Sequence, residues 1–406
     1  MRATTSTTAR SAAARAHAHA LGCFLRGSGD PGPALERALG AEPDFVPAHL
    51  LRAGLAIASK DRGALGALDA VLAQLGRCTP RMSEREQAHL AAAHAWRVGA
   101  LGRAAALYAS IVRLWPHDLL ALRLAQSCCF LLGDARALHE VAARAMPYWC
   151  AGMPGYDCAL AMHAFGLEEI GAYGRAQAVG RRALEIAPRN PVAVHAVAHA
   201  LASAGDPLAG LHWMESRADA WSNDGAMAAH NWWHVALFHL ALGRGGRALA
   251  IYDAEIAPVV AASATDAADA AALLWRLELH GIAVGSRWQS VAQAFAIRPM
   301  PALWPLVDVH AAMAFAAATR ARELDRLRSA LAGAGPVARE VALPIARGLE
   351  AFAAGEYAQC AATLGACRRD AWRLGGSPLQ REVIDVTLAA ARARTAGRRL
   401  APAAAA

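Results

Sequence analysis

The amino-acid sequence predicts an all-α protein in which helical hairpins stack into one curved α-solenoid. Of its 406 residues, 56% are hydrophobic although only 6% are aromatic, and alanine dominates the hydrophobic set. Alanine is the best helix former, and its small side chain lets neighbouring helices approach closely. A chain of this length can form one extended repeat array without an internal domain boundary.

Proline turns recur along the first half of the chain. Three amphipathic segments end at Pro43, Pro116 and Pro188, which are 73 and 72 residues apart, and each is followed by a second helical pattern. Proline ends a helix because it lacks an N–H group and its ring clashes with the preceding turn. The spacing is about twice the 34-residue tetratricopeptide period, so we expect hairpins of the tetratricopeptide kind.

Glycines between helical patterns are the second recurring signal. They occur at Gly133, Gly171, Gly243 and Gly355. Such glycines close a helix because they adopt the left-handed backbone conformation readily. One hairpin cannot bury its apolar face alone, so neighbouring hairpins must stack. We expect a continuous array over residues 26–397, after a disordered or loosely helical arm (1–25) and before a frayed tail (398–406).

Charge and cysteine usage narrow the functional classes. The formal net charge is +8, and arginine supplies nearly all of the positive charge because Lys60 is the only lysine. The arginines are spread singly and form no aromatic-plus-basic cluster, so we expect no nucleic-acid partner. No stretch of 18 residues is apolar and uncharged, so we expect no membrane span. Eight cysteines without a CxxC pair favour a reducing, cytoplasmic compartment.

Two histidine pairs with the same spacing are the main candidates for chemistry. They are His195 with His199, and His230 with His234. Residues four apart lie on one face of a helix, so four imidazoles converge if the two helices face each other. Such a cluster serves either as catalytic bases or as ligands of a divalent metal ion. Asn231 follows His230, so the glutamate of an HExxH zinc motif is missing.

Aromatic and acidic residues near these pairs are candidates for substrate binding. Trp233 lies within about 60° of the His230 face of its helix and is the residue that we expect to line a pocket. The alternative is that the tryptophans wedge between hairpins and that the histidines are core residues. Glu169 could equally pair with Arg175 on the surface. The full set of substrate-binding candidates is Trp232, Trp233, His163, Glu168, Glu169 and Asp253.

Several segments, taken together, resemble the tetratricopeptide repeat protein 38 family. The motifs HAVAH and HNWWH, in this order and followed by the turn LGGSPLQR, make the resemblance specific, and it covers roughly residues 100 to 395. The resemblance implies a helical array with inward-facing histidine motifs, but it implies no reaction. The acid that the family carries after HAVAH is replaced here by Ala202, which puts a role for that acid in doubt. The segments that carry the resemblance are residues 164–186, 191–214, 230–253, 273–288 and 374–381.

Three functions from different classes follow. Bacterial proteins of this kind occur in natural-product clusters, which implies an enzyme that oxidises a planar nitrogen heterocycle, such as a toxoflavin-type azapteridine. That enzyme would use histidine as the base and O₂ as the acceptor, without an organic cofactor. The second function is a metal-dependent hydrolase that uses the two histidine pairs. The third is a non-catalytic scaffold that binds a peptide in its concave groove.

Overall fold

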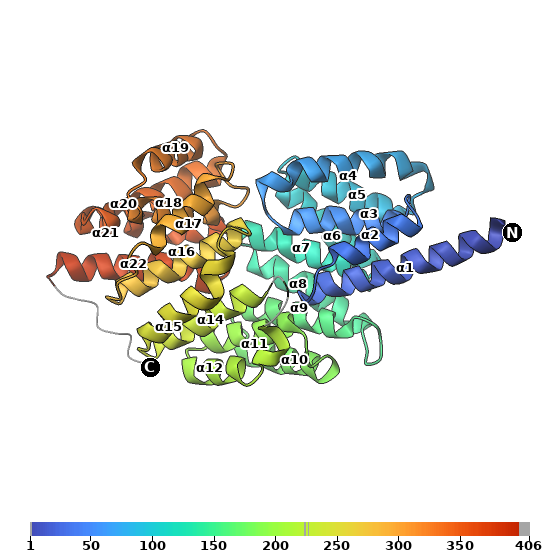
Figure 1. Cartoon of the computed structure of the whole chain (residues 1–406), viewed down its shortest axis with the longest axis horizontal. Helices are drawn as coiled ribbons and strands as arrows, with labels where there is room; N and C mark the ends of the chain where they lie inside the picture. The colour runs from blue at the N-terminus through green and yellow to red at the C-terminus, as the bar shows by residue number, and fades with distance from the viewer. Residues whose placement is uncertain (1, 223–224, 226, 398–406) are drawn as a thin grey trace.

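The computed structural model describes residues 2–222, 225 and 227–397, so the predicted C-terminal tail (398–406) lies outside the described residues (Figure 1). Within this part of the chain there are 22 α-helices and no β-strand, which confirms the all-α prediction. Short 3-10 or π turns connect or extend several of the helices. In chain order, the helices are α1 (Arg2–Arg26), α2 (Gly32–Ala41), α3 (Val46–Ala58), α4 (Leu65–Cys78), α5 (Glu84–Arg97), α6 (Leu101–Leu114), α7 (Leu119–Leu132), α8 (Ala135–Ala145), α9 (Tyr156–Glu169), α10 (Tyr173–Ile186), α11 (Pro191–Ser203), α12 (Pro207–Glu215), α13 (Ala218–Trp221), α14 (Ala228–Ala241), α15 (Gly245–Ile251), α16 (Ala264–Leu279), α17 (Arg287–Ala296), α18 (Pro305–Ala317), α19 (Ala321–Ala332), α20 (Leu343–Ala353), α21 (Tyr357–Cys367) and α22 (Pro378–Thr395).

Consecutive helices pack against one another as hairpins, for example α6 with α7 and α9 with α10. The expected proline turns follow α2, α6 and α10 directly. The four glycines predicted to close helices all have positive φ, between 70° and 80°. Any other residue type would be strained in this backbone conformation. Local turn chemistry therefore sets the hairpin boundaries as predicted.

Inner and outer helices of the array differ in how many of their faces are buried. In α10, only three of 14 residues are buried, as expected for a helix with one apolar stripe. In α11, ten of 13 residues are buried, including both histidines. A helix buried on nearly all sides lies in the inner layer, and α9 and α16 are of the same kind. The inner helices α9, α11, α14 and α16 bring the candidate residues into the interior.

The two halves of the array meet each other across this interior. Figure 1 shows α1–α8 on one side and α14–α22 on the other, with α9–α12 between them. The buried apolar residues form one large cluster in each half, and Phe130 packs against both. Two hydrogen bonds join the two halves of the array. Arg62 Nε donates to the Pro301 carbonyl (2.9 Å), and Gly376 N–H donates to the Phe130 carbonyl (3.0 Å). The curvature of the array therefore encloses its inner face.

The segment expected to be a disordered or loosely helical arm is part of helix α1 from Arg2 on. Ala13 and Ala20 are fully buried. Arg26, the last residue of α1, forms a two-bonded ion pair with Asp157 of α9 (2.8 and 2.9 Å). The side-chain amide of Asn190 donates to the same carboxylate (3.0 Å), so the ends of α1, α9 and α11 are fixed together.

No helix in the described part of the chain combines the length and the apolarity that a membrane crossing requires. All eight cysteines are free thiols within this part, and six of them are buried. Burial raises the pKa of the Cys128 and Cys360 thiols to about 12. These thiols behave as small apolar side chains and are unreactive at neutral pH.

Candidate metal centre

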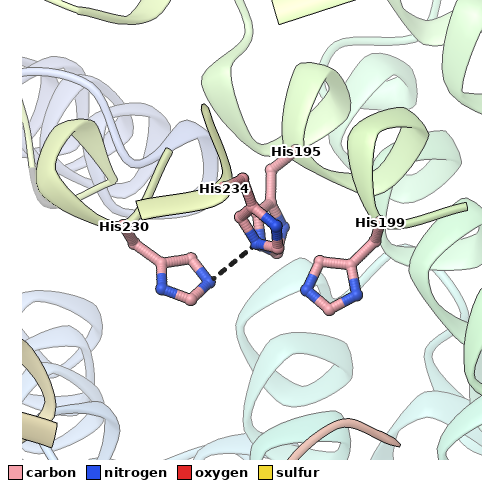
Figure 2. Close-up of side chains that lie close together, drawn as sticks. All are labelled: His195, His199, His230 and His234. Carbon is pink, nitrogen blue, oxygen red and sulfur yellow. Dashed lines mark hydrogen bonds between the residues drawn. The ribbon is translucent and has the colours of Figure 1, made fainter. Parts of the chain in front are cut away.

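Four histidines converge between α11 and α14. His195 and His199 project from α11, and His230 and His234 project from α14 (Figure 2). One ring nitrogen from each histidine can be chosen so that all four lie within 4.8 Å of one another. The Nε2 atoms of His230 and His234 are 3.3 Å apart. The predicted convergence of the two pairs is confirmed.

The local sequence explains the position of these helices. The side chain of Asn190 caps α11 by accepting the N–H of Ala193 (3.2 Å), and Pro191 occupies its first turn. Helix α12 can lie close to α14 because Gly210 faces the Phe238 ring. A Cβ at that position would lie 2.3 Å from a ring atom. The spacing of four residues then stacks each histidine pair on one helix face.

The distances within the four-histidine cluster fit one metal ion. Zinc binds imidazole nitrogen at about 2.0–2.1 Å, so neighbouring ligands in a tetrahedral site are about 3.4 Å apart. The 3.3 Å separation of the His230 and His234 nitrogens matches this value. The upper limit of 4.8 Å requires a contraction of about 1.4 Å for the widest pair. A donor set of imidazoles alone suits zinc, copper, nickel or iron.

Two carboxylates lie behind the cluster. His230 Nδ1–H donates to Asp269 Oδ2 of α16 (2.6 Å), which leaves its Nε2 lone pair directed at the cluster. Glu168 Oε2 of α9 is 3.5 Å from His199 Nδ1, and Ser203 donates to the other Glu168 oxygen (2.8 Å). A carboxylate on the outer ring nitrogen is typical of histidines that ligate metals, because it fixes the tautomer and strengthens the donor.

Burial keeps the cluster in the protonation state that binds metals. It lowers the pKa values of His195 and His234 well below 6.5, and the neighbouring imidazoles lower them further. Burial alone would raise the pKa of Glu168, but attraction to His199 and the hydrogen bond from Ser203 outweigh it and hold that pKa below its usual value. Burial, followed by repulsion from Glu168, raises the pKa of Glu169 well above its usual value. His195 and His234 are therefore neutral imidazoles at pH 7, the form that binds metal ions, with an ionised carboxylate at Glu168.

Several buried polar atoms at the cluster have no hydrogen-bond partner within the described part of the chain. They include His195 Nε2, His234 Nδ1 and both side-chain polar atoms of Asn231. Buried polar groups are nearly always hydrogen-bonded, so unpartnered ring nitrogens in a histidine cluster need a reason. A metal ion bound by one nitrogen of each ring would give His195 Nε2 a partner, whereas His234 Nδ1 would stay without one if His234 binds through its Nε2. The donor set of four imidazoles fits such an ion.

Trp233 is the tryptophan that contacts the cluster. Its ring, which is 0% exposed, stacks on His230 at 5.4 Å and meets His234 edge-on at 5.0 Å. With Asp269 and Trp304, it lines a cavity of about 10 Å³, which has room for about one water molecule. Trp232 instead packs edge-on against Trp221 at 4.9 Å. Of the two tryptophans, only Trp233 is placed to form a wall of the site.

The other predicted binding residues fall into three different environments. Glu168 and Glu169 are buried at the end of α9, so Glu169 is not a surface partner of Arg175. His163 stacks on His139 of α8 (5.6 Å), and burial, together with His139, lowers its pKa to about 4. Asp253 lies at the surface and pairs with Arg287 (2.6 and 2.7 Å), and it is not part of the four-histidine cluster.

Sequence reasoning did not find Asp269, the closest carboxylate to the cluster. It lies in an alanine- and aspartate-rich stretch that gave no sign of which face the acid would occupy. Its role depends on α16 packing beside α14, which is a long-range contact. The only local signal was the acidic side chain of Asp269 on a helix, α16, whose residues are buried on nearly all sides.

Comparison with protein-family models gives no match. Among solved structures, the chain is similar to the APC/C hetero-tetramer Cut9–Hcn1, with 11% identity, a TM-score of 0.40 and coverage of 88% of this chain and 72% of that chain. It is also similar to the TPR domain of P58(IPK), with 13% identity, a TM-score of 0.21 and coverage of 72% of this chain and 84% of that chain. These similarities are too distant to support a conclusion about function, and the fold is therefore described from the arrangement of the helices alone.

Proposed function

We propose that this helical-repeat protein is a metal-dependent enzyme, most simply a hydrolase, that holds one divalent transition-metal ion in the four-histidine cluster. The observation that carries the proposal is the convergence of four largely buried imidazoles within 4.8 Å. Asp269 adds to this, because its carboxylate lies 2.6 Å from His230 Nδ1 and a carboxylate on the outer ring nitrogen is typical of histidines that ligate metals.

The residues of the site would have separate roles. His195, His199, His230 and His234 would hold the ion. Because four protein ligands fill a tetrahedral site, water would have to bind as a fifth ligand, and the ion would then act as a Lewis acid towards that water. Asp269 and Glu168 would orient His230 and His199. The His230 side chain is 18% exposed and that of His199 only 2%, so a substrate would approach from the His230 side. Trp233 would form the wall on that side.

The cofactor-free oxidation of a planar nitrogen heterocycle is our second candidate. Trp233 and Trp304 line the cavity beside Asp269 and offer aromatic faces to such a ligand. A cavity of about 10 Å³ must open before a heterocycle enters, which makes this function the weaker of the two. Membership of the tetratricopeptide repeat protein 38 family and a cytoplasmic location are part of the proposal, and the free, buried thiols support the latter.

A non-catalytic scaffold is the remaining alternative. Stacked hairpins of this kind often bind peptides along an inner groove. The inner face here is filled with histidine, tryptophan and buried carboxylates, which favours a small ligand or an ion over a peptide backbone.

Metal analysis of the full-length protein tests the main proposal. We expect one zinc-, copper- or nickel-type ion per chain, removed by a chelator and regained on titration, and no binding by the double variant H199A/H234A. Hydrolysis of an ester and phosphoester panel, and oxygen uptake with a panel of planar heterocycles, should then be measured with and without chelator. Activity lost with the metal and restored by it supports the hydrolase. Oxygen uptake that is indifferent to chelator favours the second candidate, and the absence of stoichiometric binding rejects the metal centre.

A further inference from the structure

The connection between α17 and α18, residues 298–304, separates a groove at the surface from a cavity in the interior. The surface groove has a volume of about 410 Å³ and is also lined by Arg326 and Ser329 of α19. The inner cavity has a volume of about 20 Å³ and is also lined by Asp308 of α18. Residues 298–300 line both spaces, so they form the wall between them.

The inner cavity continues towards the four-histidine cluster. Val307 lines it and also lines the cavity of about 10 Å³ beside Trp233 and Asp269. Trp233 stacks on His230, and the Asp269 carboxylate lies 2.6 Å from His230 Nδ1. Three spaces with shared walls therefore lead from the surface to His230, and the widest of them is the groove at the surface.

Both ends of the connection are anchored. At its start, Arg298 Nη2 donates to the Ala261 carbonyl (2.7 Å). At its end, Trp304 is 2% exposed, donates from Nε1 to the Leu374 carbonyl (2.8 Å) and packs its ring against Phe130 (5.6 Å). Arg298 and Trp304 are therefore fixed points on either side of the residues between them.

The middle of the connection, residues 299–303, is held much less firmly. Two hydrogen bonds join it to the rest of the described chain: Arg62 Nε donates to the Pro301 carbonyl (2.9 Å), and the Ala302 N–H donates to Asp308 Oδ1 (2.8 Å). None of the five residues is fully buried, and none belongs to a helix. A segment with few hydrogen bonds and an exposed backbone opens at a lower free-energy cost than the helices that flank it.

We propose that residues 299–303 are a lid, which pivots at Arg298 and Trp304 and admits a substrate from the surface groove to the His230 side of the cluster. While the lid is closed, cavities of about 20 and 10 Å³ have room for only one or two water molecules and no substrate passes. Closure over a bound substrate excludes bulk water from the reaction, as lids of enzymes do.

Arg62 and Asp308 are the latches of this lid. Arg62 belongs to the first half of the array and Asp308 to the second, so the closed lid is fixed to both halves. The identity of the site under the lid rests on the proposed metal centre, but the movement itself requires no metal ion. The lid can therefore be tested on metal-free protein.

Two measurements on the full-length protein after chelation test the first latch. Arg62→Met keeps most of the side-chain length but removes the donor to the Pro301 carbonyl. Amide hydrogen exchange in 299–303 should become about three- to tenfold faster, because one hydrogen bond is lost. Modification of His230 by diethyl pyrocarbonate, located by peptide mapping, should accelerate by a similar factor. The matched control is Arg97→Met, which breaks a surface ion pair with Asp69 and should change neither rate.

Asp308→Ala tests the second latch, because it removes the acceptor of the Ala302 N–H, and it should accelerate both reactions in the same way. Circular dichroism should show unchanged helicity, and either variant alone decides the question if the other does not fold. Faster exchange in 299–303 without faster modification of His230 would show that the segment only joins the two halves. Unchanged exchange would show that these hydrogen bonds do not hold it closed.

A third measurement separates the lid from the metal centre. If Zn²⁺ binds, a chelator should extract it about three- to tenfold faster from Arg62→Met than from the native protein, since extraction then follows the same opening. If no metal ion binds, the metal centre fails, and the exchange and modification rates still decide the lid. If Zn²⁺ binds but His230 reacts at the native rate in both latch variants, the lid is rejected and the metal centre stands.

Discussion

Inward-facing histidines gather at two places in this molecule, the four-histidine cluster of α11 and α14 and the pair His139–His163 between α8 and α9. The members of the pair stack at 5.6 Å and 23°, and burial followed by nearby cations lowers the pKa values of both. The cluster is more deeply buried than the pair, and Asp269 and Glu168 lie behind two of its rings. Desolvation alone makes a neutral imidazole, whereas a carboxylate behind the ring also directs its lone pair inward.

Removing a ligand is expected to have the largest effect on metal binding. His199→Ala or His234→Ala should weaken binding of Zn²⁺ or Cu²⁺ by more than about 100-fold, because an outer partner alone is typically worth about ten- to 100-fold. His163→Ala should change the affinity less than about threefold. Competition against a chromophoric chelator measures all three variants. Equal affinities in the cluster and pair variants would show that the two histidine groups do not differ in function.

Removing the carboxylate behind His230 should have the next largest effect. Asp269→Asn should weaken metal binding by about ten- to 100-fold, because the amide neither fixes the His230 tautomer nor raises its basicity. The matched control is Asp253→Asn, which breaks only a surface ion pair with Arg287. Equal losses in the two variants would mean that general electrostatics, and not the contact with His230, accounts for the effect.

The contrast also shows which parts of the site a sequence can predict. The hairpins followed from proline and glycine positions because turn chemistry is local. The convergence of His195 with His234 followed from two equal spacings on neighbouring helices. The roles of Asp269 and Asp253 did not follow, because each depends on which distant helix packs beside it. The different directions in which Trp232 and Trp233 leave their helix could be estimated from the sequence, since adjacent helical residues face about 100° apart.

The pH dependence of the free energy of unfolding distinguishes histidines that are buried as core residues from histidines that have a carboxylate on the outer ring nitrogen. His310 is buried and donates from Nδ1 to the Leu306 carbonyl (2.7 Å), and burial lowers its pKa to about 4. Below pH 6.5 the unfolded chain takes up this proton and the folded chain does not, so stability that is present above pH 6.5 is lost as the pH falls towards 4. The loss is about 1.4 kcal/mol per pH unit, or tenfold in the folding equilibrium.

His310→Met should therefore flatten the slope of the free energy of unfolding against pH by about one proton between pH 6.5 and 4.5. Urea unfolding at several pH values measures this slope. Asp308 contributes with the opposite sign, because its raised pKa gives stability that is lost as the pH rises towards 7, and it does so in both proteins. An unchanged slope would show that His310 is protonated in the folded state and does not belong with the desolvated histidines.

The smallest expected effect concerns the aromatic wall of the cluster. Trp233→Phe should change metal affinity by less than about threefold, because phenylalanine keeps a ring against His230 and leaves the Asp269 contact in place. The same substitution should remove much of the fluorescence quenching caused by Cu²⁺, since this indole stacks directly on a ligand. Trp232→Phe is the matched control, because Trp232 packs on Trp221 and should leave both affinity and quenching nearly unchanged. A loss of affinity as large as that of Asp269→Asn would make Trp233 a positioning residue for His230. Quenching that depends on Trp232 instead would place the ion on the other side of α14 and contradict the four-histidine centre.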